Sequence, residues 1–236
     1  MGRSDVQIDL ATGMPMETNK IPLAVKLVYT AFVAVMVPIY WRDYGPQNFL
    51  YFCDVAILTT LVALWLESSF LISMQAVAIL LPQTVWVIDY LAHFANLHLL
   101  GMTDYMFDSN RSLFLRGISL FHGWLPFLIV WMLIRLGYDK RAFVPQIVVG
   151  LALLAICYFG FAPPPAPLAK PNLAVNINYV YGLSDNSPQT IMPPLAWLGM
   201  LMVVFPVGIY LPTHLILCRV LSKREVLPEV GEAVAV

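Results

Sequence analysis

The sequence predicts an all-α polytopic membrane protein, a bundle of six transmembrane helices, on two observations. First, 60% of the 236 residues are apolar and 11% are charged, whereas about a quarter of the residues in an ordinary soluble domain are charged. Second, the apolar residues form continuous runs of the length that a membrane-spanning helix needs, about twenty residues. These runs do not alternate between apolar and polar residues, which argues against a transmembrane barrel.

Six segments reach the spanning length, with edges that a sequence defines only to within a few residues. They lie at 22–40, 48–66, 69–92, 113–135, 142–162 and 193–220. Helix is the expected conformation because a helix satisfies its own backbone N–H and C=O groups in lipid. The chain then divides into an N-terminal segment 1–21, a transmembrane domain 22–220 and a C-terminal tail 221–236, with both outer segments expected in the cytoplasm.

The basic residues predict this orientation. With the N-terminus inside, nine Lys or Arg residues fall in inner segments and four in outer ones, and cytoplasmic loops carry the excess of positive charge. The four outer residues are Arg42, Arg111, Arg116 and Lys170. Two long connections, roughly 93–112 and 163–192, then lie on the outer side. We expect them to cover the outer end of the bundle.

Composition also limits the partners and the redox chemistry. A net charge of −1 gives too little basic surface for a nucleic-acid binder, so the expected partners are the lipid bilayer and a small-molecule or lipid-like ligand. The three cysteines, Cys53, Cys157 and Cys218, form no CxxC pair. We interpret each as a small buried hydrophobic residue. The sequence indicates no particular cofactor.

Ionisable residues inside spans are costly and mark candidate functional sites. The second, third and fourth spans contribute five of them, all near the predicted outer side: Asp54, Asp89, His93, Arg116 and His122. Because consecutive helices joined by short turns tend to be neighbours, we expect these side chains to form one buried polar pocket that opens outward. Arg116 would hold an anionic group in it.

Each member also has a structural interpretation. For Asp54 and Arg116 we favour a structural interpretation, in which the two side chains form an ion pair that holds their helices together. Asp89 and His93 are four residues apart, so they share a helix face and are expected to pair or relay a proton. His122 lies deeper, with no carboxylate one turn away, and a functional role is slightly favoured.

Three other polar features receive weaker interpretations. Ser119 precedes His122 by three residues, a spacing that does not aim an imidazole well at a serine hydroxyl. In the 93–112 connection, Asp104 and Asp108 could bind a cation loosely, but a solvated acidic turn is the expected interpretation. His214, in the inner half of the last span, is expected to pack between helices or lie at the interface.

Three function hypotheses follow. The first is a membrane protein that binds or transports a small solute through the outward-opening pocket. The second is a metal-assisted membrane hydrolase of a lipid-like substrate, with Asp89, His93 and His122 as metal ligands. The chain has no HExxH motif to support it. The third is a non-catalytic accessory or assembly subunit, in which the five residues only hold helices together.

Three stretches carry a family resemblance. They are YWRDYGPQNFL at 40–50 with Cys53 and Asp54 after it, TDYMFD at 103–108 and SLFHGWLP at 119–126. Together they resemble a group of bacterial multi-pass inner-membrane proteins, over roughly residues 40–218. The resemblance implies a bacterial inner membrane. It implies no substrate, cofactor or catalytic residue.

Overall fold

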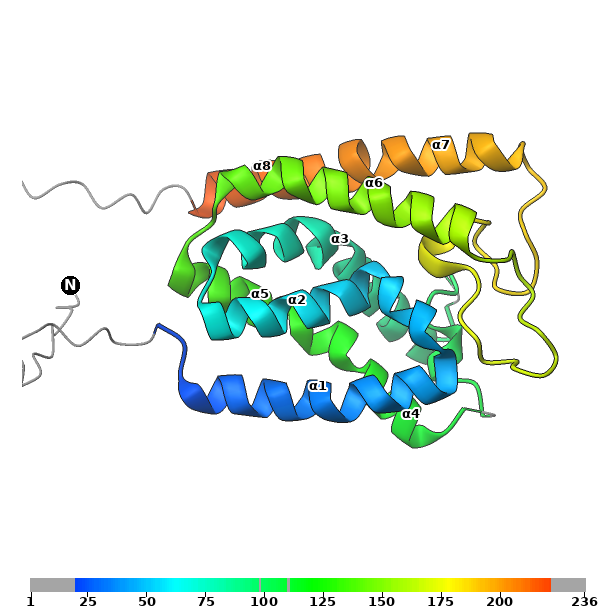
Figure 1. Ribbon diagram of the computed structural model, residues 1–236, viewed down its shortest axis with the longest axis horizontal. Coiled ribbons are helices and arrows are strands. Elements are labelled where there is room, and N and C mark those ends of the chain that lie inside the picture. The colour runs from blue at the N-terminus through cyan, green and yellow to red at the C-terminus, as the bar shows by residue number, and fades with distance from the viewer. Residues whose placement is uncertain (1–19, 98, 110, 222–236) are drawn as a thin grey trace, which may run out of the picture.

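The computed structural model describes residues 20–97, 99–109 and 111–221, and all regular secondary structure within them is helical (Figure 1). The predicted all-α class is therefore confirmed for these residues. Apart from residues 20, 21 and 221, the expected N-terminal segment 1–21 and tail 221–236 lie outside the described part of the chain.

Within that part, five helical segments are long and apolar enough to cross a membrane, and each coincides with a predicted span. They are α1 (Leu23–Tyr44), α3 (Ser69–Phe94), α4 with α5 (Leu113–Ser119 and Phe121–Leu136), η3 with α6 (Lys140–Ala142 and Phe143–Gly160), and α7, η5 and α8 (Pro194–Val204, Phe205–Tyr210 and Leu211–Leu221). The last segment is continuous because η5 is a π-helical turn that joins its two α-helices.

The predicted span 48–66 differs from the others. Its helix, α2 (Phe52–Leu66), has 15 residues, which corresponds to about 22 Å against a bilayer core of about 30 Å. The preceding residues form a short 3₁₀ helix, η1 (Pro46–Leu50), and Tyr51 between the two helices has extended backbone angles. The apolar run therefore contains two short helices, and its length alone does not support a sixth span.

Helix α3 is the centre of the bundle. It packs against α2, α5, α6 and α8, and every residue from Ile72 to Ile79 is buried. A helix that is buried all round must be surrounded by other helices. Helix α1 lies on one side of it, and α6, α7 and α8 lie together on the other (Figure 1).

The two ends of the bundle differ. The terminal end contains the start of α1, the α2–α3 turn, the link 137–142 between α5 and α6, and the end of α8 (Figure 1). The loop-rich end contains the end of α1, η1, and the two long connections 95–112 and 161–193. These connections carry the short helices η2 (Asp104–Met106) and η4 (Ile177–Tyr179). All five predicted pocket residues lie in the half of the bundle nearer the loop-rich end.

Candidate functional site

Asp54, in the first turn of α2, is buried with 3% of its surface exposed. The Asn48 side-chain amide donates a hydrogen bond of 3.1 Å to its Oδ2, and the Cys53 thiol lies 3.8 Å from the same oxygen. Among the residues that the structure describes, no group donates a hydrogen bond to its Oδ1. A buried carboxylate oxygen without a donor is costly, so this atom is a candidate contact for a polar ligand.

Arg116 does not pair with Asp54, although the structure describes both side chains. Its Nη1 donates to the carbonyl oxygen of Met106 at 3.1 Å, and its Nε has no hydrogen-bond partner within the described part of the chain. The expected ion pair is therefore not formed. Arg116 fastens the 95–112 connection to α4 instead.

Asp89 and His93 organise the same connection. Asp89 Oδ1 accepts a hydrogen bond from the backbone N–H of Leu100, and Oδ2 accepts from the backbone N–H and hydroxyl of Thr103, all at 2.8–3.0 Å. The His93 ring stacks on Phe107 with ring centres 3.7 Å apart, and its Nδ1 lies 3.7 Å from Asp104 Oδ1. Both residues thus hold the loop against the end of α3.

His122 is fixed by its own helix region and by α3. Its Nδ1 is 2.8 Å from the carbonyl oxygen of Ser119, and its ring stacks on Trp86 with ring centres 4.8 Å apart. The Ser119 hydroxyl is hydrogen-bonded to the Tyr40 hydroxyl at 2.8 Å. The imidazole therefore contacts the serine carbonyl and not its hydroxyl. This agrees with the expectation that the spacing does not aim the imidazole at a serine nucleophile.

The metal-ligand set expected as an alternative is not assembled. Among residues 20–97, 99–109 and 111–221, no group of three or more His, Cys, Asp or Glu side chains could hold a metal ion. Asp89 accepts hydrogen bonds from the loop, while His122 is stacked on Trp86. The two loop carboxylates each lie near a basic side chain: Asp104 near His93, and Asp108 Oδ2 at 3.9 Å from Arg111 Nε.

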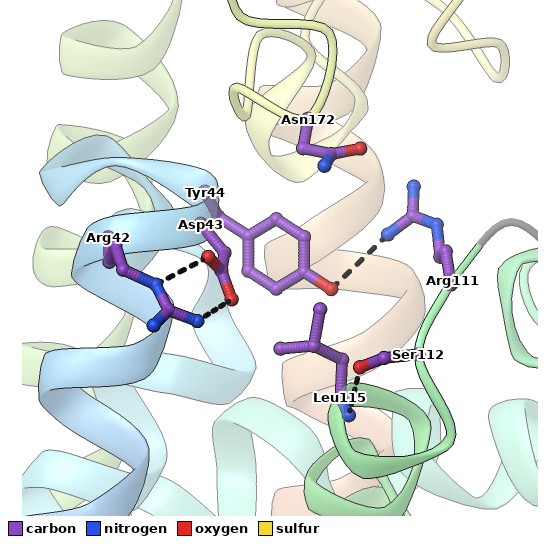
Figure 2. Close-up of a pocket in the computed structure, with 7 residues that line it drawn as sticks. All are labelled: Arg42, Asp43, Tyr44, Arg111, Ser112, Leu115 and Asn172. Atoms are coloured by element: carbon purple, nitrogen blue, oxygen red, sulfur yellow. Dashed lines mark hydrogen bonds and ion pairs between the residues drawn. The ribbon is translucent and has the colours of Figure 1, made fainter.

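A pocket of about 290 Å³ lies at the loop-rich end (Figure 2). It is formed by the last turn of α1, the start of α4 and the 161–193 connection, and its lining residues are Arg42, Asp43, Tyr44, Arg111, Ser112, Leu115 and Asn172. Helix α1 stops here because Gly45 takes a positive φ of 80°, a conformation that favours glycine.

The pocket contains two guanidinium groups. The Arg42 guanidinium donates to both carboxylate oxygens of Asp43, at 2.8 and 3.1 Å. The Arg111 guanidinium lies over the rings of Tyr44 and Tyr105, 5.7 and 5.5 Å from their centres, and donates to the Tyr44 hydroxyl at 3.4 Å (Figure 2). Each guanidinium also has a carboxylate nearby, Asp43 for Arg42 and Asp108 for Arg111.

Aromatic and hydroxyl groups connect this pocket with the buried polar residues. The rings of Tyr44 and Tyr40 meet edge to face with centres 5.1 Å apart. Tyr40 then reaches Ser119, which contacts His122, and Tyr40 also interacts electrostatically with Asp54. Sequence analysis gave Tyr40 no role in the site and missed this link.

The two pocket arginines were also missed as site residues. Sequence analysis used Arg42 and Arg111 only to orient the chain. The signal that could have found them is that both are basic residues on the predicted outer side, where the positive-inside bias makes Lys and Arg uncommon.

Comparison with known proteins reveals no relative. No family model, curated protein or solved structure matches the chain. Its function therefore has to be argued from the geometry above.

Proposed function

We propose that the protein is an integral membrane protein of a bacterial inner membrane that binds a small anionic solute at its loop-rich end. In this proposal the chain crosses the membrane six times, with η1 and α2 together forming the sixth crossing. Both termini lie in the cytoplasm and the loop-rich end faces outward. The five long apolar helices support membrane insertion, the nine-to-four distribution of basic residues supports the orientation, and the family resemblance supports a bacterial inner membrane.

The observation that carries the binding proposal is the pocket lined by Arg42 and Arg111. A guanidinium presents a planar fork of N–H donors that matches carboxylate and phosphate oxygens. The two arginines are 69 positions apart in the sequence, yet they line one pocket. Basic residues on the outer side of the membrane oppose the positive-inside bias. An anionic ligand that binds Arg42 and Arg111 would explain why the chain keeps them there.

Buried polar residues next to the pocket extend this proposed site towards the interior of the bundle. Beside the pocket, a line of side-chain contacts runs from Tyr44 through Tyr40 to Ser119, and Tyr40 also interacts electrostatically with Asp54, whose Oδ1 lacks a donor among the described residues. A solute with hydroxyl or amine groups could satisfy that oxygen. Transport is the extended form of the proposal, in which the solute moves inward along this path. Asp89, His93 and Arg116 act by holding the loop that covers it.

Phosphate binding by the full chain in nanodiscs of neutral phosphatidylcholine tests the proposal. Inorganic phosphate and glycerol 3-phosphate are the probes, and calorimetric titration is the measurement. We expect Arg111→Ala to weaken binding about tenfold, equivalent to about 1.4 kcal/mol. Glycerol 3-phosphate binding much tighter than phosphate would indicate a lipid-headgroup ligand.

Arg135→Ala is the matched control. Its guanidinium also lies over an aromatic ring, 5.0 Å from the centre of Trp131, but at the terminal end. Binding should be unchanged in this variant. Equal weakening in both variants, or no binding of either probe to the unmodified protein, contradicts the proposal and favours the accessory-subunit hypothesis.

A further inference from the structure

Two buried hydrogen-bond donors in the half of the bundle nearer the loop-rich end have no acceptor among the described residues. Trp86, in α3, is 4% exposed, and its indole N–H bonds to no described group. The Arg116 guanidinium donates to the Met106 carbonyl through Nη1, but its Nε–H is buried without an acceptor in the described part of the chain. A buried donor without an acceptor is costly, so each of these atoms needs an explanation.

Both donors lie next to the short helix η2 in the 95–112 connection. The Tyr105 hydroxyl interacts with the side chains of Trp86 and Ser119. Met106, whose carbonyl binds Arg116, is the next residue of η2. Arg116 and Ser119 are three residues apart in α4 and are therefore neighbours on that helix. Helices α3 and α4 and the connection thus bring two N–H donors and two hydroxyl groups together.

This group of donors has a positive charge without a carboxylate partner. Among the described residues, no carboxylate forms an ion pair with the Arg116 guanidinium. The buried carboxyl group of Asp54 interacts electrostatically with Tyr40 but not with Tyr105. A guanidinium with a free N–H, surrounded by further donors, is suited to bind the oxygen atoms of an anion.

Tyr105 connects these donors with the outer pocket. The Arg111 guanidinium, which lines that pocket, lies 5.5 Å from the centre of the Tyr105 ring. Tyr105 is only partly buried and belongs to a connection, not to one of the long helices. Because connections move more readily than the helices they join, the Tyr105 side chain is the group that would turn to admit an anion from the pocket.

We propose that an inner anion subsite is formed by two N–H donors and two hydroxyl groups, those of Trp86, Arg116, Tyr105 and Ser119. This inference rests on the proposed function and extends it inward. The phosphate or carboxylate group that first meets Arg42 and Arg111 passes Tyr105 and binds to the inner donors. There the anion accepts the hydrogen bonds that the indole N–H and the Nε–H do not otherwise make.

Trp86→Phe tests the subsite in the full chain in phosphatidylcholine nanodiscs. The variant removes the indole N–H and keeps an aromatic ring to stack on His122. Because this N–H bonds to no described group, we expect thermal stability to be unchanged. Phosphate affinity, measured by calorimetric titration, should fall about fivefold, the contribution of one hydrogen bond.

Trp197→Phe is the matched control. Its indole N–H donates to the Tyr179 carbonyl at 2.9 Å, and the side chain is also buried. This variant loses a hydrogen bond of the fold, so it should be less stable and should bind phosphate as tightly as the unmodified protein.

The indole resonance of Trp86 in a nitrogen–proton correlation spectrum reports on the inner subsite alone, and its absence in Trp86→Phe assigns it. Added inorganic phosphate should move this resonance and leave that of Trp197 in place. Movement in nanodiscs that contain phosphatidylglycerol, before phosphate is added, would support the subsite with a lipid headgroup as its anion.

The outer and inner sites can fail separately. If calorimetry shows phosphate binding but the Trp86 resonance stays in place, or if Trp86→Phe binds phosphate as tightly as the unmodified protein, the inner subsite is overturned and the outer pocket stands. If phosphate does not bind and neither phosphate nor phosphatidylglycerol moves the resonance, the proposed function and the inner subsite are both overturned.

Discussion

The two ends of the bundle treat their buried charges differently. At the terminal end, Glu67 accepts hydrogen bonds from the Lys26 ammonium at 2.8 Å and from the backbone N–H groups of Lys20 and Ile21. At the loop-rich end, Asp89 is satisfied by backbone and hydroxyl donors, and Asp54 keeps one oxygen without a partner. A carboxyl group whose oxygens all accept hydrogen bonds from the protein holds the fold, whereas a carboxyl oxygen without a donor is available to a ligand.

Glu67→Gln should show the largest effect because it breaks the pair that closes the terminal end. Lys26 is 5% exposed and loses its carboxylate partner in this variant. A buried charge that loses its partner destabilises a fold by about 3–5 kcal/mol. Unfolding in a mild detergent, followed by circular dichroism, measures the change. A loss no larger than that of Asp89→Asn would break the contrast between the two ends.

Asp89→Asn should destabilise the loop-rich end by about 1.5–3 kcal/mol, the contribution of hydrogen bonds to a charged group. The amide can still accept at one oxygen, but its nitrogen faces donors of the 95–112 connection. We expect faster hydrogen exchange at the Leu100 and Thr103 amides. The α2–α3 turn at Glu67 serves as the internal reference, and faster exchange there as well would indicate global rather than local opening.

Acidification should weaken the terminal end first. Burial acts to raise the pKa of Glu67, but the hydrogen bonds from Lys26 and from two backbone N–H groups outweigh it, so the pKa lies below its ordinary value. A carboxyl group with a lowered folded-state pKa stabilises the protein above its unfolded-state pKa. That contribution should fade as the pH falls below about 4.5. The unfolding midpoint as a function of pH should fall less steeply in Glu67→Gln, and identical slopes would contradict this assignment.

Arg42→Ala and Arg141→Ala should have the smallest effects on stability. Both arginines form ion pairs with a neighbouring aspartate, Asp43 and Asp139, and both side chains are largely exposed. Exposed pairs contribute little to folding, so we expect no measurable change in melting temperature for either variant. Phosphate titration separates them, because only Arg42→Ala should weaken binding, by severalfold. Equal binding by the two variants would remove Arg42 from the site.

Sequence patterns predicted the helices better than the contacts. Five of the six predicted spans coincide with long apolar helices, because continuous apolar runs report directly on burial in lipid or protein. The run 48–66 stays a predicted span, and composition does not reveal the extended Tyr51 that separates η1 from α2 within it. Similar depths of Asp54 and Arg116 along their helices suggested an ion pair. Depth leaves the rotation of each helix undetermined, and rotation decides which side chains meet.

By itself, the sequence determined the helical class, the positions of the long apolar segments and the depth of the polar residues within them. These properties are local, since each depends on the composition of one run of residues. Only the tertiary structure decided that Arg42 and Arg111 line one pocket, that Asp89 anchors a loop and that Tyr138 meets His214. Those arrangements depend on how helices distant in sequence rotate and pack against each other, and no single run of residues contains that information.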